Sequence, residues 1–363
     1  MKTHVFLSTL LFALFTYSTF AQNVPTIDVQ PWSIEQKDGK ITKQLAKYPH
    51  VVFKGGLWLN QGRNIASKHR FGGLSAIWVS DHGTKLFAVS DYSSLKKYNE
   101  LHYEKDGRIL HRKYNSCWFQ FDLTYDDNQY LIDAILMKSG QLADSIGIII
   151  RGESEGVAVL GDTIYVSKDQ DPYILLFDKN DFEEDRFTIQ EKRRIQIVLK
   201  ESFGKNDGIE AFTRTRDNKL FAIREMGNGK QKLRNAWLID PKTPKDSIRY
   251  LDYINDFEEV KGATTLFNGD IVVLEKTRKN NRNKIKLVLV RQEDLEKEKP
   301  IHPSTTLLRL SSKKALDNIE GIASYARDGK EYLLLISDDN GDNRITQNTL
   351  LLHFELNLEY LRK

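Results

Sequence analysis

The stretch ESEGVAVLGDTIYVSKD, Glu153–Asp169, carries the pattern that decides the fold. A Glu-Gly pair at 155–156 opens a short apolar run. A Gly-Asp turn at 161–162 then leads into a β-branched run that ends on Lys168-Asp169. Two apolar runs of this length on either side of a Gly/Asp turn predict a β-hairpin.

The same plan recurs along the chain. Each copy has a small or acidic start, an apolar run, an Asp/Asn/Gly turn, a second apolar run and a closing charge. The other copies begin at Phe71, Asn206, Val260 and Asp317, and the copy at Val260 is the weakest. Aligned on Gly73, Glu155, Glu210, Lys261 and Glu320, the copies recur about every 50–60 residues after a longer first step, and β-patterned repeats of roughly 40–50 residues are typical of propellers.

We therefore expect an all-β fold, a β-propeller of six blades with four antiparallel strands each. The long first step can hold an extra, degenerate blade or a large insertion. Residues 22–363 are expected to form one propeller domain, because no low-complexity linker divides them. The strand-like residues of Tyr48–Leu59 are expected to complete the last blade and close the ring, since few residues follow Glu320.

The first residues, Met1–Ala21, read as a signal peptide. Lys2 supplies a positive start, Val5–Tyr17 is mostly apolar, and Thr19-Phe20-Ala21 places small residues where cleavage requires them. A membrane anchor is the alternative, but the apolar run is short of the ~20 residues that span a bilayer. The sequence thus predicts export, to the periplasm or the medium, with no later membrane span.

Composition bears on how the fold is stabilised and on which partners the protein can bind. The sole cysteine after the predicted signal peptide, Cys117, cannot form an intrachain disulfide, so the fold must be held by burial and strand pairing. The formal net charge of +4 is nearly balanced, and the Lys-rich stretch Lys276–Lys286 reads as a solvated hairpin loop. Nucleic-acid binding is not expected without a basic face. We expect a monomer.

Acids at the starts of the repeats are the first candidate site. Glu155, Glu210 and Glu320 occupy equivalent positions, and a propeller would bring such positions together around its axis. Carboxylates cannot gather unpaired without repulsion, and calcium, with six to eight oxygen ligands, relieves it. The alternative is that each glutamate accepts hydrogen bonds from backbone N–H groups of its own turn and fixes its blade.

Charged residues at the end of the following strand are the second candidate. The acids predicted here are Asp91, Asp169, Glu225, Glu275 and Asp338, and all but Glu275 are also predicted metal ligands. Their basic neighbours, predicted to bind substrate, are Lys168, Arg224 and Lys276. Adjacent strand residues point to opposite faces, so one of each pair is expected to face a shared pocket. A metal-bridged phosphate would suit this mixture; we favour salt bridges between blades.

Other motifs are weaker. Ser337–Arg344, SDDNGDNR, resembles a calcium loop but lacks the closing glutamate of an EF-hand, which favours a turn rich in Asx caps. There is no Gly-x-Ser-x-Gly nucleophile motif and no phosphate-binding P-loop. The sequence therefore assigns no catalytic residue.

The repeat residues resemble the phytase-like family, described as esterase-like activity of phytase. The matching pieces are Phe71–Ser75, Leu86–Asp91, Glu153–Ala158, Asp207–Ala211, Leu220–Glu225 and Asn318–Ala323. The resemblance spans about Phe71 to Phe354. It implies an exported β-propeller with hydrolase activity, and relatedness to calcium-dependent propeller phytases would imply a calcium cluster and phosphomonoester substrates. The balanced charge disfavours phytate itself.

Two hypotheses follow from these observations. In the first, the protein is an exported, calcium-dependent hydrolase of phosphate or carboxylic esters, in which metal-activated water is the nucleophile. In the second, it is a non-catalytic propeller that binds a ligand or a protein, and its channel acids are structural. Loss of ester hydrolysis in chelator and in Glu155→Gln separates the first from the second.

Overall fold

The computed structural model describes residues 27–61, 71–80, 82–90, 115–150, 154–169, 173–184, 186–197, 207–226, 233–243, 248–255, 257–297, 299–303, 305–339, 348–357 and 359. The predicted signal peptide and Asp91 lie outside these ranges. Within them, no helix is both long enough and apolar enough to cross a bilayer.

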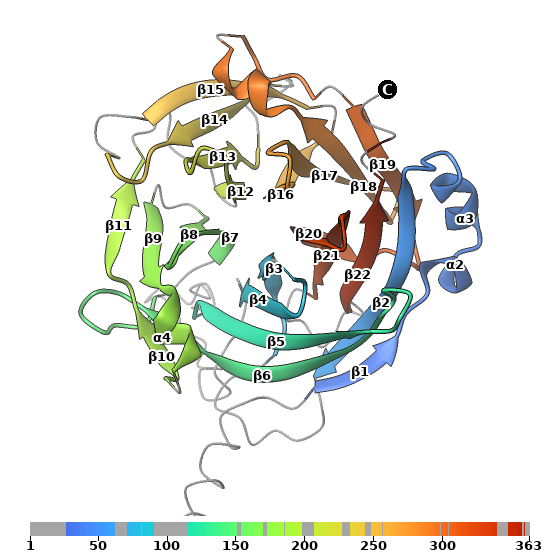
Figure 1. The fold of residues 1–363 in the computed structure, drawn as a ribbon, viewed down its shortest axis with the longest axis horizontal. Coiled ribbons are helices and arrows are strands. Elements are labelled where there is room, and N and C mark those ends of the chain that lie inside the picture. The colour runs from blue at the N-terminus through green and yellow to red at the C-terminus, as the bar shows by residue number, and fades with distance from the viewer. Residues whose placement is uncertain are drawn as a thin grey trace, which may run out of the picture.

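Five sheets stand around a common axis like the blades of a wheel, and their strands pair antiparallel except at β10 (Figure 1). The strand nearest the axis in each sheet is β3, β7, β12, β16 or β20. Each of these strands contacts the corresponding strand of the next sheet, and β20 contacts β3. The ring is therefore closed, and the fold is an all-β propeller.

Blades 1 to 4 follow the chain from the axis outward. Blade 1 contains β3 (Leu74–Val79), β4 (Lys85–Ser90), β5 (Cys117–Tyr125) and β6 (Leu131–Ala143); blade 2 contains β7 (Ser154–Leu160), β8 (Thr163–Lys168), β9 (Tyr173–Asp178) and β11 (Arg193–Gln196). Blade 3 contains β12 (Ile209–Arg214), β13 (Leu220–Arg224), β14 (Leu233–Ile239) and β15 (Ile248–Ile254); blade 4 contains β16 (Glu259–Thr265), β17 (Ile271–Lys279), β18 (Arg282–Val290) and β19 (Thr305–Ser312). The short β10 (Thr188–Gln190), which follows helix α4 (Lys179–Glu183), pairs in parallel with β6.

Blade 5 joins the two ends of the described chain. Its strands β20 (Asn318–Arg327), β21 (Lys330–Asp338) and β22 (Thr349–Leu356) are followed outward by β2 (Val51–Gln61) and β1 (Ile27–Pro31). The pairing of β2 with β22 confirms that an N-terminal strand completes the last blade. Helices α2 (Ile34–Lys37) and α3 (Lys40–Leu45) connect β1 to β2 and pack on blade 5 and the edge of blade 4, while the 3-10 helix η1 (Gln292–Glu296) follows β18.

The predicted six blades are wrong; there are five. The long first step suggested room for one more blade. Its described residues instead extend blade 1, where β5 has nine residues and β6 has 13. Blades 1 and 5 also carry a fifth strand. The predicted four strands per blade is therefore right for blades 2, 3 and 4 and wrong for blades 1 and 5.

The hydrophobic core is divided into five clusters, each between two neighbouring blades. Leu274 of blade 4 and Leu335 of blade 5, for example, belong to one cluster, and both are fully buried. Each sheet therefore buries both faces, which is why its inner strands read as continuous apolar runs rather than as alternating ones. Burial of one such side chain stabilises the fold by about 1.5–3 kcal/mol.

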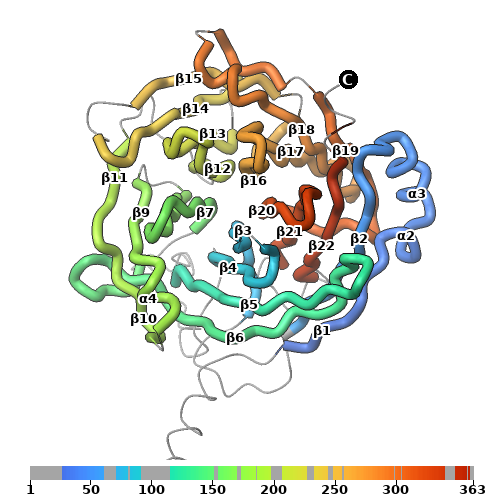
Figure 2. Tube along the Cα trace, viewed as in Figure 1, coloured from blue at the N-terminus to red at the C-terminus, as the bar shows by residue number. Residues whose placement is uncertain are grey.

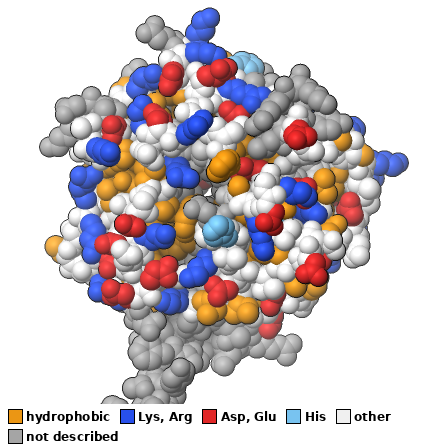
Figure 3. Space-filling model, viewed as in Figure 1, with side chains coloured by type: hydrophobic (Ala, Val, Ile, Leu, Met, Phe, Trp, Pro, Cys, Tyr) orange, Lys and Arg blue, Asp and Glu red, His pale blue; other side chains and the backbone are white. Residues whose placement is uncertain are grey.

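The surface carries mixed charge. Figure 3 shows acidic and basic side chains interspersed over the face that it draws, without a large patch of one sign. This distribution accords with the nearly balanced net charge.

Candidate active site in the channel

Each innermost strand skips one residue in its pairing with the following strand. A β-bulge of this kind leaves a residue out of the ladder and re-aims its side chain. The skipped residues, one per blade, are Ser75, Glu155, Glu210, Lys261 and Glu320. Because the innermost strands surround the axis (Figure 2), these five residues form one set, which we call the channel ring.

A small residue follows every ring position. These residues are Ala76, Gly156, Ala211, Gly262 and Gly321. A Cβ atom on Gly156 would lie 3.1 Å from the carbonyl oxygen of Glu210, and one on Gly262 would lie 2.9 Å from that of Glu320. The innermost strand of one blade therefore packs against the ring residue of the next, and glycine permits this close approach.

Lys261 of blade 4 lies among three carboxylates from the two neighbouring blades, 3 and 5. Its Nζ is 2.5 Å from Oε1 of Glu225, 3.4 Å from Oε1 of Glu210 and 3.6 Å from Oε1 of Glu320. All four side chains are at least nine-tenths buried. Because burial strengthens the attraction between charges and also makes an unpaired charge costly, these ion pairs are mutually dependent.

A second lysine extends the network to the first residue of β20. Lys276 Nζ lies 2.8 Å from Glu320 Oε1 and 2.6 Å from Asn318 Oδ1, and its ion pair with Glu259 Oε2 is 3.4 Å long. Asn318 donates from Nδ2 to the same Glu320 oxygen and to Asp338 Oδ2. Glu320 is therefore held between two lysines and an amide.

The pKa values of the two ring glutamates next to Lys261 are shifted in opposite directions. Burial raises the pKa of Glu210 well above its usual range, and the nearby charges of Glu155 and Glu225 raise it further. Burial alone would also raise the pKa of Glu320, but Lys261 and Lys276 outweigh it and lower that pKa to about 2. Neighbouring carboxyl groups whose pKa values are driven apart can serve as an acid and a base at one pH.

Three polar atoms near the ring are buried and accept or donate no hydrogen bond within the described residues. They are Glu210 Oε2, Ser75 Oγ and Ser154 Oγ. Buried polar atoms in native proteins are nearly always bonded, to protein or to ordered water. The ring therefore offers hydrogen-bonding positions that solvent or a ligand can occupy.

The charged residues predicted at the end of the second strand of each blade fall into two sets. This is expected, because adjacent residues of a strand point to opposite faces of the sheet. Ser154 pairs with Lys168, Ile209 with Arg224 and Val260 with Glu275, so these three strand-end residues are equivalent. The next residue in each blade, and the partner of Asn318 in blade 5, belong to the other set: Asp169, Glu225, Lys276 and Asp338.

Glu275 is thus misplaced in the predicted set of acids, because Lys276 holds that position in blade 4. The side chain of Glu275 lies between blades 3 and 4, where it accepts a hydrogen bond from Tyr253 Oη of β15 at 2.9 Å and pairs with Lys286 of β18.

The predicted substrate-binding residues have different surroundings. Arg224 donates from Nε and Nη2 to Asp207, at distances of 2.6–3.1 Å, and both side chains are buried. Lys168 is the buried equivalent of Arg224 in blade 2. Lys276 joins the Lys261 network through its ion pair with Glu320.

A model of the phytase-like family, described as esterase-like activity of phytase, matches residues 69–341. The chain belongs to the phytase-like family. The match covers all five innermost strands, and it confirms the resemblance found in the repeat residues. Among curated proteins, none matches this member of the phytase-like family.

Solved structures resemble this phytase-like chain in fold alone. Glutaminyl cyclase of Myxococcus xanthus is 10% identical over 78% of this chain and 91% of its own, with a TM-score of 0.42. Allergen Mala s 1 of Malassezia sympodialis is 15% identical over 84% and 90%, with a TM-score of 0.38. The GH32 β-fructofuranosidase BmSUC1 of Bombyx mori is 14% identical over 88% and 66%, with a TM-score of 0.45.

The calcium site that the phytase-like resemblance implies does not fit the described ring residues. Calcium needs several oxygen ligands directed at one point. Here the ammonium of Lys261 already lies between Glu210, Glu225 and Glu320. Across the described part of the chain, no group of three or more His, Cys, Asp or Glu side chains has a metal-binding arrangement. Calcium binding elsewhere stays a prediction.

Sequence reasoning missed two ring members. Lys261 was aligned with the glutamates but not chosen as a site residue, because it breaks the acidic pattern. Ser75 was missed because the first repeat was aligned on Gly73. The usable signal was the small residue that follows each ring position, which aligns Ser75 with Glu155 and Lys261.

Proposed function

We propose that this phytase-like protein hydrolyses phosphate or carboxylic esters at the channel ring, with Glu210 as its acid. The observation that carries the proposal is the environment of this carboxyl group. It is buried, one of its oxygens has no hydrogen bond within the described residues, and its pKa is raised by burial and by Glu155 and Glu225. Family membership supports the reaction class.

The proposed chemistry divides the work between carboxyl groups. Water attacks the phosphorus or carbonyl carbon and gives its proton to the carboxylate of Glu155. The ester C–O or P–O bond breaks, and protonated Glu210 gives its proton to the leaving oxygen. Proton exchange with solvent restores both groups. General acid–base catalysis of this kind contributes about 10²–10⁴-fold.

Lys261 has two roles in this proposal. Its ammonium, close to Glu210, Glu225 and Glu320, stabilises the negative charge that develops on the substrate oxygens. It also keeps Glu320 ionised, so that the raised pKa of Glu210 remains distinct from that of its neighbour. Because the ring side chains are nearly buried, the reacting group must be small enough to enter the channel.

The experiment compares hydrolysis of p-nitrophenyl phosphate and p-nitrophenyl acetate by the wild type and Glu210→Gln. The variant should lose at least about 100-fold in kcat/KM. Glu191→Gln is the matched control, because Glu191 is an equally buried acid that pairs with Arg194 away from the ring. Equal activity of wild type and Glu210→Gln would refute the assignment.

A non-catalytic propeller is the second candidate, and one observation favours it. Glu225 and Glu320 are both engaged by lysines, as structural ion pairs between blades would be. In that case neither ester is hydrolysed by the folded wild type, whether calcium or a chelator is added. The same assays therefore separate the two candidates.

Export is part of the proposal. The apolar run Val5–Tyr17 and the small residues before Gln22 support it. N-terminal sequencing of protein recovered from cell fractions should find a mature chain that begins at Gln22, outside the cytoplasm.

A further inference from the structure

A cavity of about 420 Å³ lies at the opposite end of the innermost strands from the channel ring. Its lining comes from the end of β12, the end of β16 and its turn, the end of β20, and the turn between β3 and β4. Glu210 and Arg214 stand at opposite ends of β12, four residues or about 13 Å apart along the strand. The cavity is therefore a separate place from the proposed active site.

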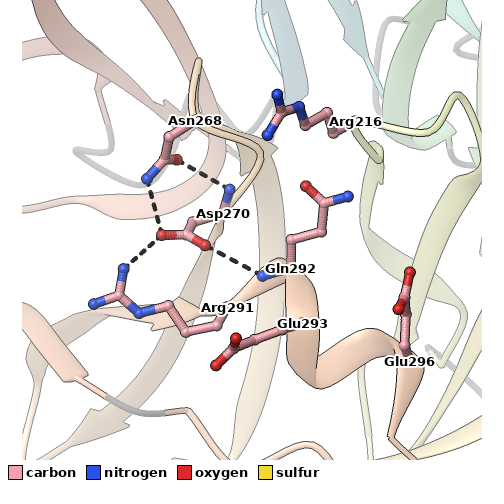
Figure 4. Close-up of a pocket in the computed structure, with 7 residues that line it drawn as sticks. All are labelled: Arg216, Asn268, Asp270, Arg291, Gln292, Glu293 and Glu296. Atoms are coloured by element: carbon pink, nitrogen blue, oxygen red, sulfur yellow. Dashed lines mark hydrogen bonds and ion pairs between the residues drawn. The ribbon is translucent and has the colours of Figure 1, made fainter.

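The cavity has an excess of positive charge. Arg214 and Arg216 line it, together with the imidazole of His82, and neither arginine forms an ion pair among the residues that the structure describes. Figure 4 shows Arg216 in the adjoining pocket, where dashed lines join Asp270 to other residues and none reaches the Arg216 guanidinium. Asp270 is already bound by Arg291 at 2.7 Å.

The acid in the cavity lining, Glu331, has a pKa near neutral pH. Glu331 is buried, and its Oε2 accepts a hydrogen bond from the backbone N–H of Phe267 at 3.1 Å. Burial raises the pKa of Glu331 to about 7. Its charge therefore cancels at most part of the charge of the two arginines near neutral pH.

The rim of the cavity is apolar. Phe267, at the tip of the β16–β17 turn, has 84% of its surface exposed, the largest fraction among the exposed large hydrophobic residues described. The bond from its N–H to Glu331 fixes its backbone at the edge of the cavity. Tyr325 and Leu266 line the cavity beside it. An exposed aromatic ring beside guanidinium groups that form no ion pair with the described residues is a feature of ligand sites.

We propose that this cavity binds a small organic anion with an aromatic part, whose anionic group contacts Arg214 and Arg216 and whose ring packs on Phe267. Arginine suits such a ligand because its planar fork binds the oxygens of a carboxylate or a phosphate in pairs. The cavity volume is that of a site for a small molecule. This site does not depend on the ester hydrolysis proposed for the ring.

Isothermal titration calorimetry with phenyl phosphate tests the proposal, and benzyl alcohol and inorganic phosphate serve as partial ligands. Phenyl phosphate should bind more tightly than either. Arg216→Gln should weaken its binding about tenfold, and Arg214→Gln,Arg216→Gln should weaken it further. Arg249→Gln, on the exposed outer strand β15 of the same blade, is the matched control and should bind like the wild type.

Three results would overturn the proposal. They are no binding of phenyl phosphate by the wild type, equal binding by the double variant, and inorganic phosphate binding as tightly as phenyl phosphate. Thermal melts of each variant show that it is folded. Glu210→Gln must bind phenyl phosphate normally, so loss of the ring activity and loss of this site are distinguishable. If phenyl phosphate is hydrolysed during titration, phenylphosphonate replaces it.

Discussion

Lys261 balances the charges of the channel. It is the one ring residue with a positive charge, and it contacts carboxylates of blades 3 and 5. Those carboxylates in turn raise the pKa of Lys261 well above its usual range, against the opposing effect of burial. The ammonium and its neighbours thus form one unit rather than separate pairs.

Removal of this charge should be costly. Lys261→Met leaves Glu225 and Glu320 without one of their cations, and breaking a buried ion pair destabilises by about 3–5 kcal/mol. Urea denaturation at pH 7 measures the loss. Lys297→Met is the control, because Lys297 is half exposed and pairs with Asp294 at the surface; it should change stability by less than about 0.5 kcal/mol. Equal stabilities of both variants would contradict the account.

The raised pKa of Glu331 predicts that the stability of the fold depends on pH. This pKa is about 7 in the fold, against about 4.3 in an unfolded chain, so the folded state binds the proton more tightly. The stability that this proton contributes is complete below pH 4.3 and is lost as the pH rises through 7. Glu331→Gln cannot ionise.

Glu331→Gln should therefore be more stable than the wild type at pH 8 by about 2 kcal/mol, with the difference vanishing at pH 4. Urea denaturation across this range measures it. A difference independent of pH would show that Glu331 titrates normally.

At the scale of single strands, the bulge decides which side chain reaches the channel. The glutamates at 155, 210 and 320 could be aligned from sequence because each precedes a small residue at a strand start. The position at the other end of the hairpin could not, because the order of the charges is reversed in blade 4: the base precedes the acid in Lys168-Asp169 and Arg224-Glu225, but the acid comes first in Glu275-Lys276. For this reason Glu275 was grouped with the acids, although Lys276 holds that position.

Gly262 should tolerate no larger side chain. A Cβ there would lie 2.9 Å from the Glu320 carbonyl oxygen and 3.0 Å from Cγ2 of Ile322. Gly262→Val should destabilise by about 1–3 kcal/mol through overpacking. Gly39→Ala is the control, because nothing lies within 4 Å of the added atom. If Gly262→Val melts at the wild-type temperature, the innermost strands are not packed as described.

At the scale of the whole molecule, the repeats predict a closed ring of blades. The small number of residues after Glu320 predicts that an N-terminal strand completes the last blade. The number of blades was not predictable. Spacing along the chain cannot tell an inserted loop from a degenerate blade, and the first step contains residues that lengthen β5 and β6. Five sheets close the ring because β20 meets β3 directly.

The closure predicts that β1 and β2 are essential. A chain that begins at residue 62 leaves β22 as an unpaired edge and removes Leu57 and Leu59 from the hydrophobic cluster between blades 5 and 1, so the other residues of that cluster lose their cover. It should lose its cooperative thermal transition and aggregate, whereas a chain that begins at Gln22 should melt as a single unit. Circular dichroism melts of the two chains compare them. A cooperative transition in the shorter chain would mean that blade 5 is stable without β2.

The most direct test is the pKa of Glu210, measured by ¹³C NMR on protein labelled at the glutamate carboxyl carbon. The resonance missing from Glu210→Gln identifies the residue. We predict that it titrates well above the ordinary value of about 4.3, and higher still in Lys261→Met. Titration at or below that value, unchanged in Lys261→Met, would show that the ring carboxyls and Lys261 do not meet in the channel.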